Sequence, residues 1–353
     1  MKEERIHYID IAKAFGIIAI VLGHIYGDGY IRHILYAFHV PLFFFLSALF
    51  FNTSNSLLQN LKEKFRTVMI PYYLVALLSI GIYAIFGSFV ARTLGKSLEE
   101  FSDTNVITNV FGMLYGNSRT GLMNWNRPLW FLPCLFVTLL LLAFVEKTIV
   151  KNRNEVRVLV LIMTIGGGYA IQAINPVLPL QAECSLPMLT WMELALMLKP
   201  YILNLNDKNV LLPLKRIEKI GCLIGGLIIA VVIGLTNATV EVRINYYGTY
   251  PLYLMGAGLF IFLILSCAKR IGKNKILEYV GRNTMQILLF HKFSILFFQS
   301  VFGPTKRRLR NLDTIEGTVC ALCVATITIV GCLVLKEGYR YIRNLVIRRY
   351  NRR

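Results

Sequence analysis

Ten long apolar runs dominate this sequence and limit what the chain can fold into. Most approach the roughly 20 residues that a helix needs to cross a bilayer, and charged residues, Pro or Gly bound them. They lie near residues 9–26, 34–51, 68–86, 129–146, 156–173, 186–203, 221–235, 249–268, 280–301 and 314–335. With 56% hydrophobic and 16% charged residues, the composition excludes an ordinary soluble enzyme and a disordered chain. The sequence therefore predicts an all-α integral membrane protein with about ten transmembrane helices.

The basic residues predict how these helices are oriented, because Lys and Arg accumulate in cytoplasmic loops. With the N-terminus inside, 25 of the 38 Lys and Arg residues fall in cytoplasmic segments and 10 in outer loops. One outer loop, with basic residues from Lys306 to Arg310, departs from this bias. We therefore expect both termini in the cytoplasm. The net charge of +19 is explained by this topology and by anionic lipid, and it does not indicate nucleic-acid binding.

We expect a single transmembrane domain over residues 1–353. Its long connection, residues 87–128, is predicted outside and is either a lid over the outer mouth or a plain loop. Residues 336–353 are predicted to form a basic cytoplasmic tail that anchors the orientation. Cys320 and Cys323 have the spacing of metal ligands, but no second pair lies nearby in the sequence, so we predict no metal site.

Ionisable side chains within the predicted spans are few, and their cost in a bilayer makes them candidate functional residues. Lys13 and His24 are 11 residues apart, and at 100° per residue both project from one face of the first helix. The rise between them is about 16 Å. Asp10 can pair with Lys13 at the inner mouth. This face links a cytoplasmic-side cation to an imidazole in the outer half.

His39, Glu193 and His291 are predicted at a depth similar to that of His24. A wet polar chamber in the outer half of the bundle would satisfy all four side chains. A neutral histidine suits a general base that activates a hydroxyl, and a carboxylate can orient it. Each histidine alone could equally bond a neighbouring helix. The alignment of His24 with Lys13 favours a functional role, with Lys13 suited to a phosphorylated cytosolic donor.

Five short strings resemble, in order along the chain, the membrane-bound acyltransferase-3 family, particularly its fucose O-acetylase-like and O-antigen O-acetyltransferase-like members. They are residues 5–10 with Lys13 and 21–24, residues 38–47, residues 64–66 with 70–72, residues 128–132, and residues 279–284 with His291. Each string alone is weak. Their order across nearly the whole chain, on a ten-helix plan, makes the resemblance specific.

The resemblance implies an O-acetyltransferase that moves an acyl group, usually acetyl, from cytosolic acetyl-CoA to a hydroxyl. The acceptor would be a cell-envelope glycan or a lipid-linked sugar, and the setting would be the cytoplasmic membrane of a bacterium. The resemblance also implies that His24 is catalytic and Lys13 essential. Basic residues at the start of the third helix, here Lys64 and Arg66, would bind the donor.

The remaining site predictions combine the resemblance with the polar residues inside the spans. Glu193 is predicted to be catalytic with His24, by orienting the base, or else to bind sugar hydroxyls. His39, Trp130 and His291 are predicted to line the acceptor side, although Trp130 is equally typical of a membrane-interface anchor. Acetyl-CoA, the sugar acceptor and membrane lipids are the expected partners.

The chain departs from the family pattern at three positions. Lys13 stands where the family usually has Arg, which keeps the charge but loses the bidentate geometry for phosphate. Thr67 stands where a second Arg is common, so either Arg66 takes that role or the donor site is weaker. Ala48 replaces a frequent Gly, which we interpret as a packing change.

Two other functions stay open at this point. A secondary transporter or polysaccharide exporter would use buried His and Glu residues to couple ions, and it predicts broken helices in two repeated halves. We find no such repeat in the sequence. A non-catalytic sensor on the acyltransferase scaffold would keep the fold but show no turnover. Hydrolysis or transfer of acetyl-CoA by the purified protein would separate these alternatives.

Overall fold

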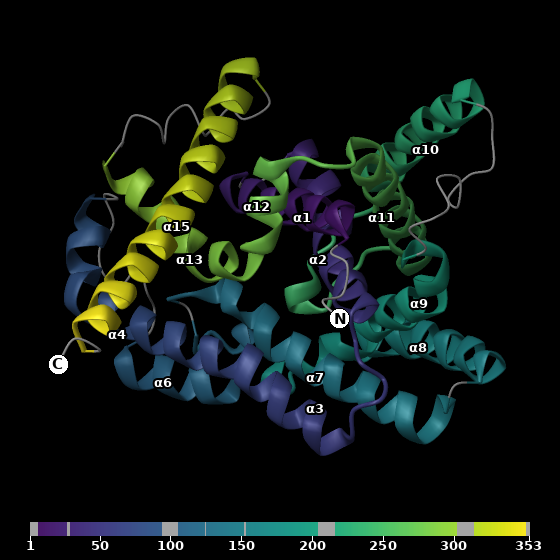
Figure 1. The fold of residues 1–353 in the computed structure, drawn as a ribbon, viewed down its shortest axis with the longest axis horizontal. Coiled ribbons are helices and arrows are strands. Elements are labelled where there is room, and N and C mark those ends of the chain that lie inside the picture. The colour runs from purple at the N-terminus through teal and green to yellow at the C-terminus, as the bar shows by residue number, and fades with distance from the viewer. Residues whose placement is uncertain are drawn as a thin grey trace.

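The structure is a computed structural model that describes residues 6–26, 29–93, 105–123, 125–151, 153–203, 216–301 and 314–350 (Figure 1). The described part is helical apart from its connections and an isolated bridge between Glu241 and Tyr246. Its α-helices are α1 (His7–Ile25), α2 (Tyr30–Leu49), α3 (Leu57–Lys64), α4 (Ile70–Thr93), α6 (Val106–Tyr115), α7 (Phe131–Val145), α8 (Asn154–Ile174), α9 (Ser185–Leu203), α10 (Arg216–Thr236), α11 (Tyr250–Ile271), α12 (Lys275–Arg282), α13 (Thr284–Val301) and α15 (Ile315–Tyr350). The all-α prediction is confirmed.

Seven helical segments of the described chain are long and apolar enough to cross a membrane. They are α1, α2, α3 joined to α4, α7 with its flanking turns, α8, α11 and α15, while α6, α10 and α13 contain shorter apolar helices. A helix also covers most of each predicted span, including α9 for residues 186–203. The chain is therefore an integral multi-pass membrane protein.

The outer surfaces of several helices are apolar, as contact with lipid requires. α4 exposes Leu74 and Ile85, α8 exposes Ile162 and Met163, and α10 exposes Ile228, each more than half accessible. So many large apolar side chains on one surface would associate in water. Facing hydrocarbon, they need no further partner.

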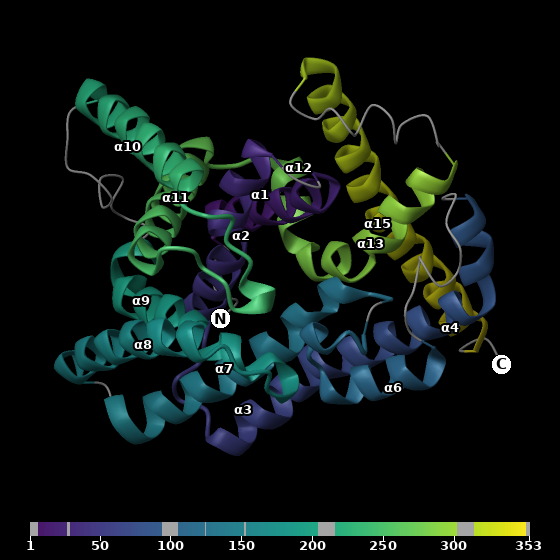
Figure 2. The same ribbon diagram turned by 180° about the vertical axis from the view of Figure 1, so that it is seen from behind.

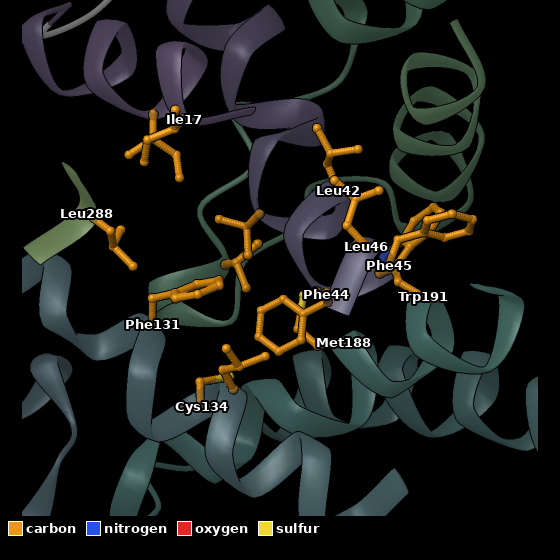
Figure 3. Close-up of a cluster of buried hydrophobic side chains, with 14 of the residues drawn as sticks. Ile17, Leu42, Phe44, Phe45, Leu46, Phe131, Cys134, Met188, Trp191 and Leu288 are labelled. Carbon is orange, nitrogen blue, oxygen red and sulfur yellow. The ribbon is translucent and has the colours of Figure 1, made fainter. Parts of the chain in front are cut away.

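Helices α1 and α2 form the centre of the molecule, between α10 and α11 on one side and α13 and α15 on the other (Figures 1 and 2). Small residues let them approach closely. A side chain on Gly16 of α1 would meet the ring of Phe43 of α2, its Cβ only 2.9 Å from Cε2. Below this pair, α7 and α9 supply apolar side chains that pack against the middle of α2 (Figure 3).

The ninth predicted span, residues 280–301, is wrong at its start. The helix breaks at Asn283, whose side chain donates to the carbonyl oxygen of Tyr279 at 2.6 Å, and α13 begins only at Thr284. The preceding helix, α12, packs against α1 instead. Gly281 permits this contact because a Cβ there would overlap the backbone carbonyl of Asp10. The break thus fixes the start of α1 against α12.

The connections gather at two ends, as alternating helices require. At the end predicted to be cytoplasmic, Lys147 donates to the carbonyl oxygen of Ser54 at 3.1 Å. At the opposite end, Asn117 donates to the carbonyl oxygen of Leu178 at 2.8 Å. These contacts join loops that the basic-residue pattern places on the same side. The two ends are called below the predicted cytoplasmic end and the predicted outer end.

The described parts of the predicted outer connection and of the basic tail are largely helical. In the connection, residues 94–104 and 124 lie outside the described residues, and the rest includes α6, which packs along α4. The hydroxyl of Tyr72 in α4 donates to the carbonyl oxygen of Met113 at 2.8 Å. The tail continues α15 as far as Tyr350, and residues 351–353 lie outside the described part.

Candidate active site

A cavity of about 380 Å³ lies between α1, α2, α7 and α13 and extends to the end of α3 and the turn that follows it. Lys13 and Lys64 are its charged lining residues, and the hydroxyls of Ser47, Thr67 and Thr284 add polarity. The rest of the wall is apolar. Ile17 of α1, Phe131 of α7 and Leu288 of α13 converge there from three helices (Figure 3). The cavity therefore has a basic mouth and an apolar interior.

Two aromatic rings at the end of α2 lie against the two lysines. The Lys13 ammonium is 5.1 Å from the centroid of the Phe50 ring, and the Lys64 ammonium is 6.0 Å from that of Phe51. Each lysine also has an acidic neighbour: Lys13 Nζ is 3.9 Å from Asp10 Oδ1, and Lys64 Nζ is 2.6 Å from a carboxylate oxygen of Glu63. The Asp10 contact is the pairing predicted from the sequence.

A π-helical turn, η1 (Phe65–Met69), joins α3 to α4 and sets which residues face the cavity. Thr67 and Val68 line it, whereas Arg66 is exposed and is not among the lining residues. Single π-helical turns inside helices are frequent at functional sites. The structure thus brings Lys13 and Lys64 to one cavity and leaves Arg66 on the surface.

One face of α1 connects the cavity to His24. Lys13, Ile17 and Ile20 line the cavity in steps of four and three residues, which keep them on one helix face. His24 is the next residue on that face. On α13, Thr284 and Leu288 line the cavity in the same way, and His291 follows one turn later.

The two faces meet in a pair of imidazole rings. The ring centroids of His24 and His291 are 5.0 Å apart, and their planes are inclined by 35°. The side chain of His24 is exposed, whereas His291 is fully buried. The ring of His24 therefore contacts a buried side chain of α13, while part of the residue stays accessible. A small molecule can therefore reach this imidazole.

The hydrogen bonds of His291 assign its tautomer. Its Nδ1 lies 2.8 Å from the carbonyl oxygen of Leu288 and 3.1 Å from that of Ile287. Carbonyl oxygens only accept, so Nδ1 carries the proton. The buried Nε2 is left as an acceptor and has no partner within the described structure.

His39 has the same arrangement on α2. Its Nδ1 donates to the carbonyl oxygen of Leu35 at 2.6 Å, and its ring packs edge-on against Tyr36 with centroids 4.9 Å apart. His39 is close enough to His24 for their charges to interact. Three imidazoles therefore gather at the outer end of the α1 face.

Glu193 lies in a different group of charges. Arg157 binds Glu146 through two hydrogen bonds of 2.8 and 3.0 Å, and its Nη1 is 3.3 Å from Glu193 Oε2. All three residues are buried. Glu146 directly follows α7 and Arg157 lies in the first turn of α8, so this group is on the predicted cytoplasmic side. The structure does not bring Glu193 to His24.

Trp130 is buried at the start of α7, in the turn η3 (Arg127–Trp130). Its ring packs edge-on against that of Phe131, with centroids 6.2 Å apart. Phe131 lines the cavity. The turn η3 also contacts α13, another helix of the cavity wall. Trp130 therefore lies behind the cavity wall.

The sequence matches a model of a known protein family over most of its length. The acyltransferase-3 model, described as an acyltransferase domain, matches residues 6–337. The chain belongs to the acyltransferase-3 family. No curated protein and no solved structure matches it. Membership supports an acyltransferase over the transporter that the buried charges alone left open.

Several residues near this acyltransferase site were not predicted as site residues. Arg32 and Lys292 both lie close enough to His24 to interact with it electrostatically, and the Arg32 guanidinium is over the Tyr36 ring at 4.6 Å. The sequence contained a signal for each. Arg32 precedes His39 by seven residues, two helical turns, and Lys292 follows His291 directly.

Proposed function

We propose that this protein transfers an acetyl group from cytosolic acetyl-CoA to a hydroxyl of a cell-envelope glycan or a lipid-linked sugar. The observation that carries the proposal is the continuous face of α1, which leads from Lys13 at the cavity mouth to His24 beside His291. Family membership supplies the acyl-transfer chemistry.

The cavity suits the donor at both of its ends. Lys13 and Lys64 offer ammonium groups to phosphates, and the apolar wall beyond them suits a long, slender arm that ends in a thioester. The wall ends near Ile20 and Leu288, one helical turn from the two imidazoles. A donor bound from the cytoplasmic side would thus present its acyl group near His24.

His24 serves as the general base in the proposed reaction. Its imidazole accepts the proton of the acceptor hydroxyl, and the oxygen attacks the thioester carbonyl carbon. The carbon–sulfur bond then breaks, and CoA leaves as the thiolate, which takes up a proton. We place His39 and His291, both buried, next to His24 on the acceptor side, and the exposed side chain of His24 gives the hydroxyl access.

The proposal is tested with protein in lipid nanodiscs, radiolabelled acetyl-CoA and a panel of glycosides. We expect Lys13→Ala to weaken donor binding, and His24→Ala to bind the donor but to lower transfer by about 10²-fold or more. Lys275→Ala, an exposed change on α12, serves as the control. Absence of donor binding by the wild type, or normal transfer by His24→Ala, would overturn the proposal.

A further inference from the structure

Three cations lie near the predicted outer end, two of them beside the histidine pair, and we call Arg32, Arg127 and Lys292 the outer cluster. Lys292 directly follows His291, whose ring is 5.0 Å from that of His24, and η3, which contains Arg127, packs against α13. Arg32 lies over the ring of Tyr36, which is next to Gly23, the residue before His24. The three cations come from three separate elements, α2, η3 and α13. None belongs to the donor cavity.

Lys292 is the member of this cluster that most needs an anion. It is partly buried on α13, and its charged neighbour is another cation, Arg127. In the described chain no carboxylate lies within ion-pair distance of its ammonium group. Withdrawing like charges from water is costly unless an opposite charge joins them.

Two described carboxylates at this end, Glu183 and Glu241, are engaged with other arginines. Glu241 Oε1 is 2.9 Å from Arg243 Nη2. Glu183 Oε1 is 3.7 Å from Arg119 Nη1 and also accepts from Asn117 at 2.7 Å. Neither of these two carboxylates is paired with Lys292, and among the described residues no ion pair balances its charge.

Packing holds Arg32 near the reacting histidine. Its guanidinium stacks over the ring of Tyr36, and that ring fills the space a side chain would occupy on Gly23, since a Cβ there would lie 2.8 Å from Cε2. Gly23 directly precedes His24. A rigid aromatic platform therefore fixes the position of Arg32 relative to the imidazole.

We propose that the acceptor is anionic, with a phosphate or carboxylate near the hydroxyl that takes the acyl group, and that Lys292 binds this anion. This inference rests on the proposed function and adds the charge of the acceptor to it. The anion would serve a second purpose. When His24 takes the hydroxyl proton it becomes a cation among cations, and an adjacent negative charge stabilises that state.

The test compares three soluble probes that differ in charge: methyl glucoside, methyl glucuronide and glucose 1-phosphate. Binding to protein in nanodiscs of neutral lipid is measured by saturation-transfer NMR, and acetyl transfer is measured with labelled acetyl-CoA. The variants are Lys292→Gln, Lys292→Arg and, as a matched control, Lys275→Gln on the exposed face of α12.

We expect at least one anionic probe to bind about tenfold or more tightly than the neutral one, as hydrogen bonds to charged groups allow. This preference should fall in Lys292→Gln, survive in Lys292→Arg and Lys275→Gln, and weaken with added salt. Tighter binding of methyl glucuronide would indicate a carboxylate on the acceptor, and tighter binding of glucose 1-phosphate would indicate a phosphate.

Equal binding of charged and neutral probes, no binding of either anionic probe at millimolar concentration, or an unchanged preference in Lys292→Gln would overturn the inference. Thermal unfolding of each variant shows whether a loss of preference comes from misfolding, and Lys292→Arg supplies a conservative replacement. Donor binding is measured separately. Failure of the proposed acyl transfer would appear there, whereas failure of the anionic-acceptor inference would leave donor binding intact.

Discussion

His291 presents an unpartnered Nε2 beside His24, because its Nδ1 proton is held by the carbonyl oxygens of Leu288 and Ile287. The centroids of the two rings are 5.0 Å apart. A carbonyl pair that fixes one tautomer leaves the other nitrogen as a permanent acceptor. His291 can therefore orient His24, and in the proposed reaction His24, which is exposed, takes the proton.

Replacing His291 by Ala should lower kcat by about tenfold or more and leave the KM for acetyl-CoA unchanged, because the residue lies beyond the donor cavity. Ser294→Ala, one turn further along α13, is the matched control and should keep normal kinetics. Steady-state kinetics at several donor concentrations check this. A rise in the donor KM with unchanged kcat would instead place His291 in donor binding.

Lys64 and Arg66 should behave differently although the sequence pairs them. Lys64 lines the cavity and Arg66 does not. Lys64→Ala should raise the Kd for acetyl-CoA about tenfold, with a reduced salt dependence, since one phosphate contact is lost. Arg66→Ala should change it by less than about threefold. Titration calorimetry at two salt concentrations measures both, and a larger effect from Arg66→Ala would contradict the cavity as the donor site.

Arg157 should be a stability determinant, because it neutralises two buried carboxylates. Arg157→Ala leaves Glu146 and Glu193 buried without a cation, which is expected to cost about 3–5 kcal/mol. Arg153→Ala is the control, since that side chain is exposed and donates to the carbonyl oxygen of Ile149 at 3.2 Å. Thermal unfolding in detergent compares the two variants, and equal melting temperatures would contradict this assignment.

The variant Glu193→Gln tests whether Glu193 orients His24, as the sequence predicts, or stabilises the fold through Arg157, as the structure indicates. If Glu193 orients His24, this variant should lose transfer activity at normal stability. In the structure it is bound to Arg157, so we expect its main effect on stability, with the transfer rate of the folded protein reduced less than in His24→Ala.

The sequence could predict what depends on helical periodicity. The all-α membrane fold followed from the apolar runs, and the shared face of Lys13 and His24 followed from 11 residues of helix, because both features are local. The contact of Asp10 with Lys13 is local as well, three residues along one helix.

Features that depend on residues far apart in the sequence could not be predicted from helical periodicity. Glu193 has its partner 36 positions away on another helix, so its depth alone suggested a neighbour of His24. The π-helical turn that brings Thr67 and not Arg66 to the cavity leaves no periodic signal. The break at Asn283 accompanies the packing of α12 against α1, and the apolar runs of the sequence do not indicate this packing.

That packing makes Gly281 sensitive to substitution. In Gly281→Ala the new Cβ would overlap the carbonyl of Asp10, so α12 must move from the start of α1 at a cost of about 1–3 kcal/mol. Gly338→Ala in α15 meets nothing within 4 Å and should be neutral or slightly stabilising. Unfolding midpoints in urea measure both, and tolerance of Gly281→Ala would contradict the close contact.

The contact between α1 and α12 should also depend on pH through Glu278, which lies at the predicted cytoplasmic end outside the spans. Its Oε2 is 2.9 Å from His7 Nδ1, and this contact lowers the pKa of Glu278 below its ordinary value, assisted by the backbone N–H of Asn274. A carboxylate with a lowered pKa stabilises the fold above its ordinary pKa, near 4.5. That contribution is lost as the pH falls through the lowered pKa.

We therefore expect the wild type to melt at a higher temperature than Glu278→Gln between pH 5 and pH 7, and this difference to shrink below about pH 4.5. Glu155→Gln, a change in an exposed carboxylate at the start of α8, should show no such pH-dependent difference. Melting curves collected across this pH range test the linkage. A difference between wild type and Glu278→Gln that stays constant into acid would show that the carboxylate keeps the same pKa in the folded and unfolded chain.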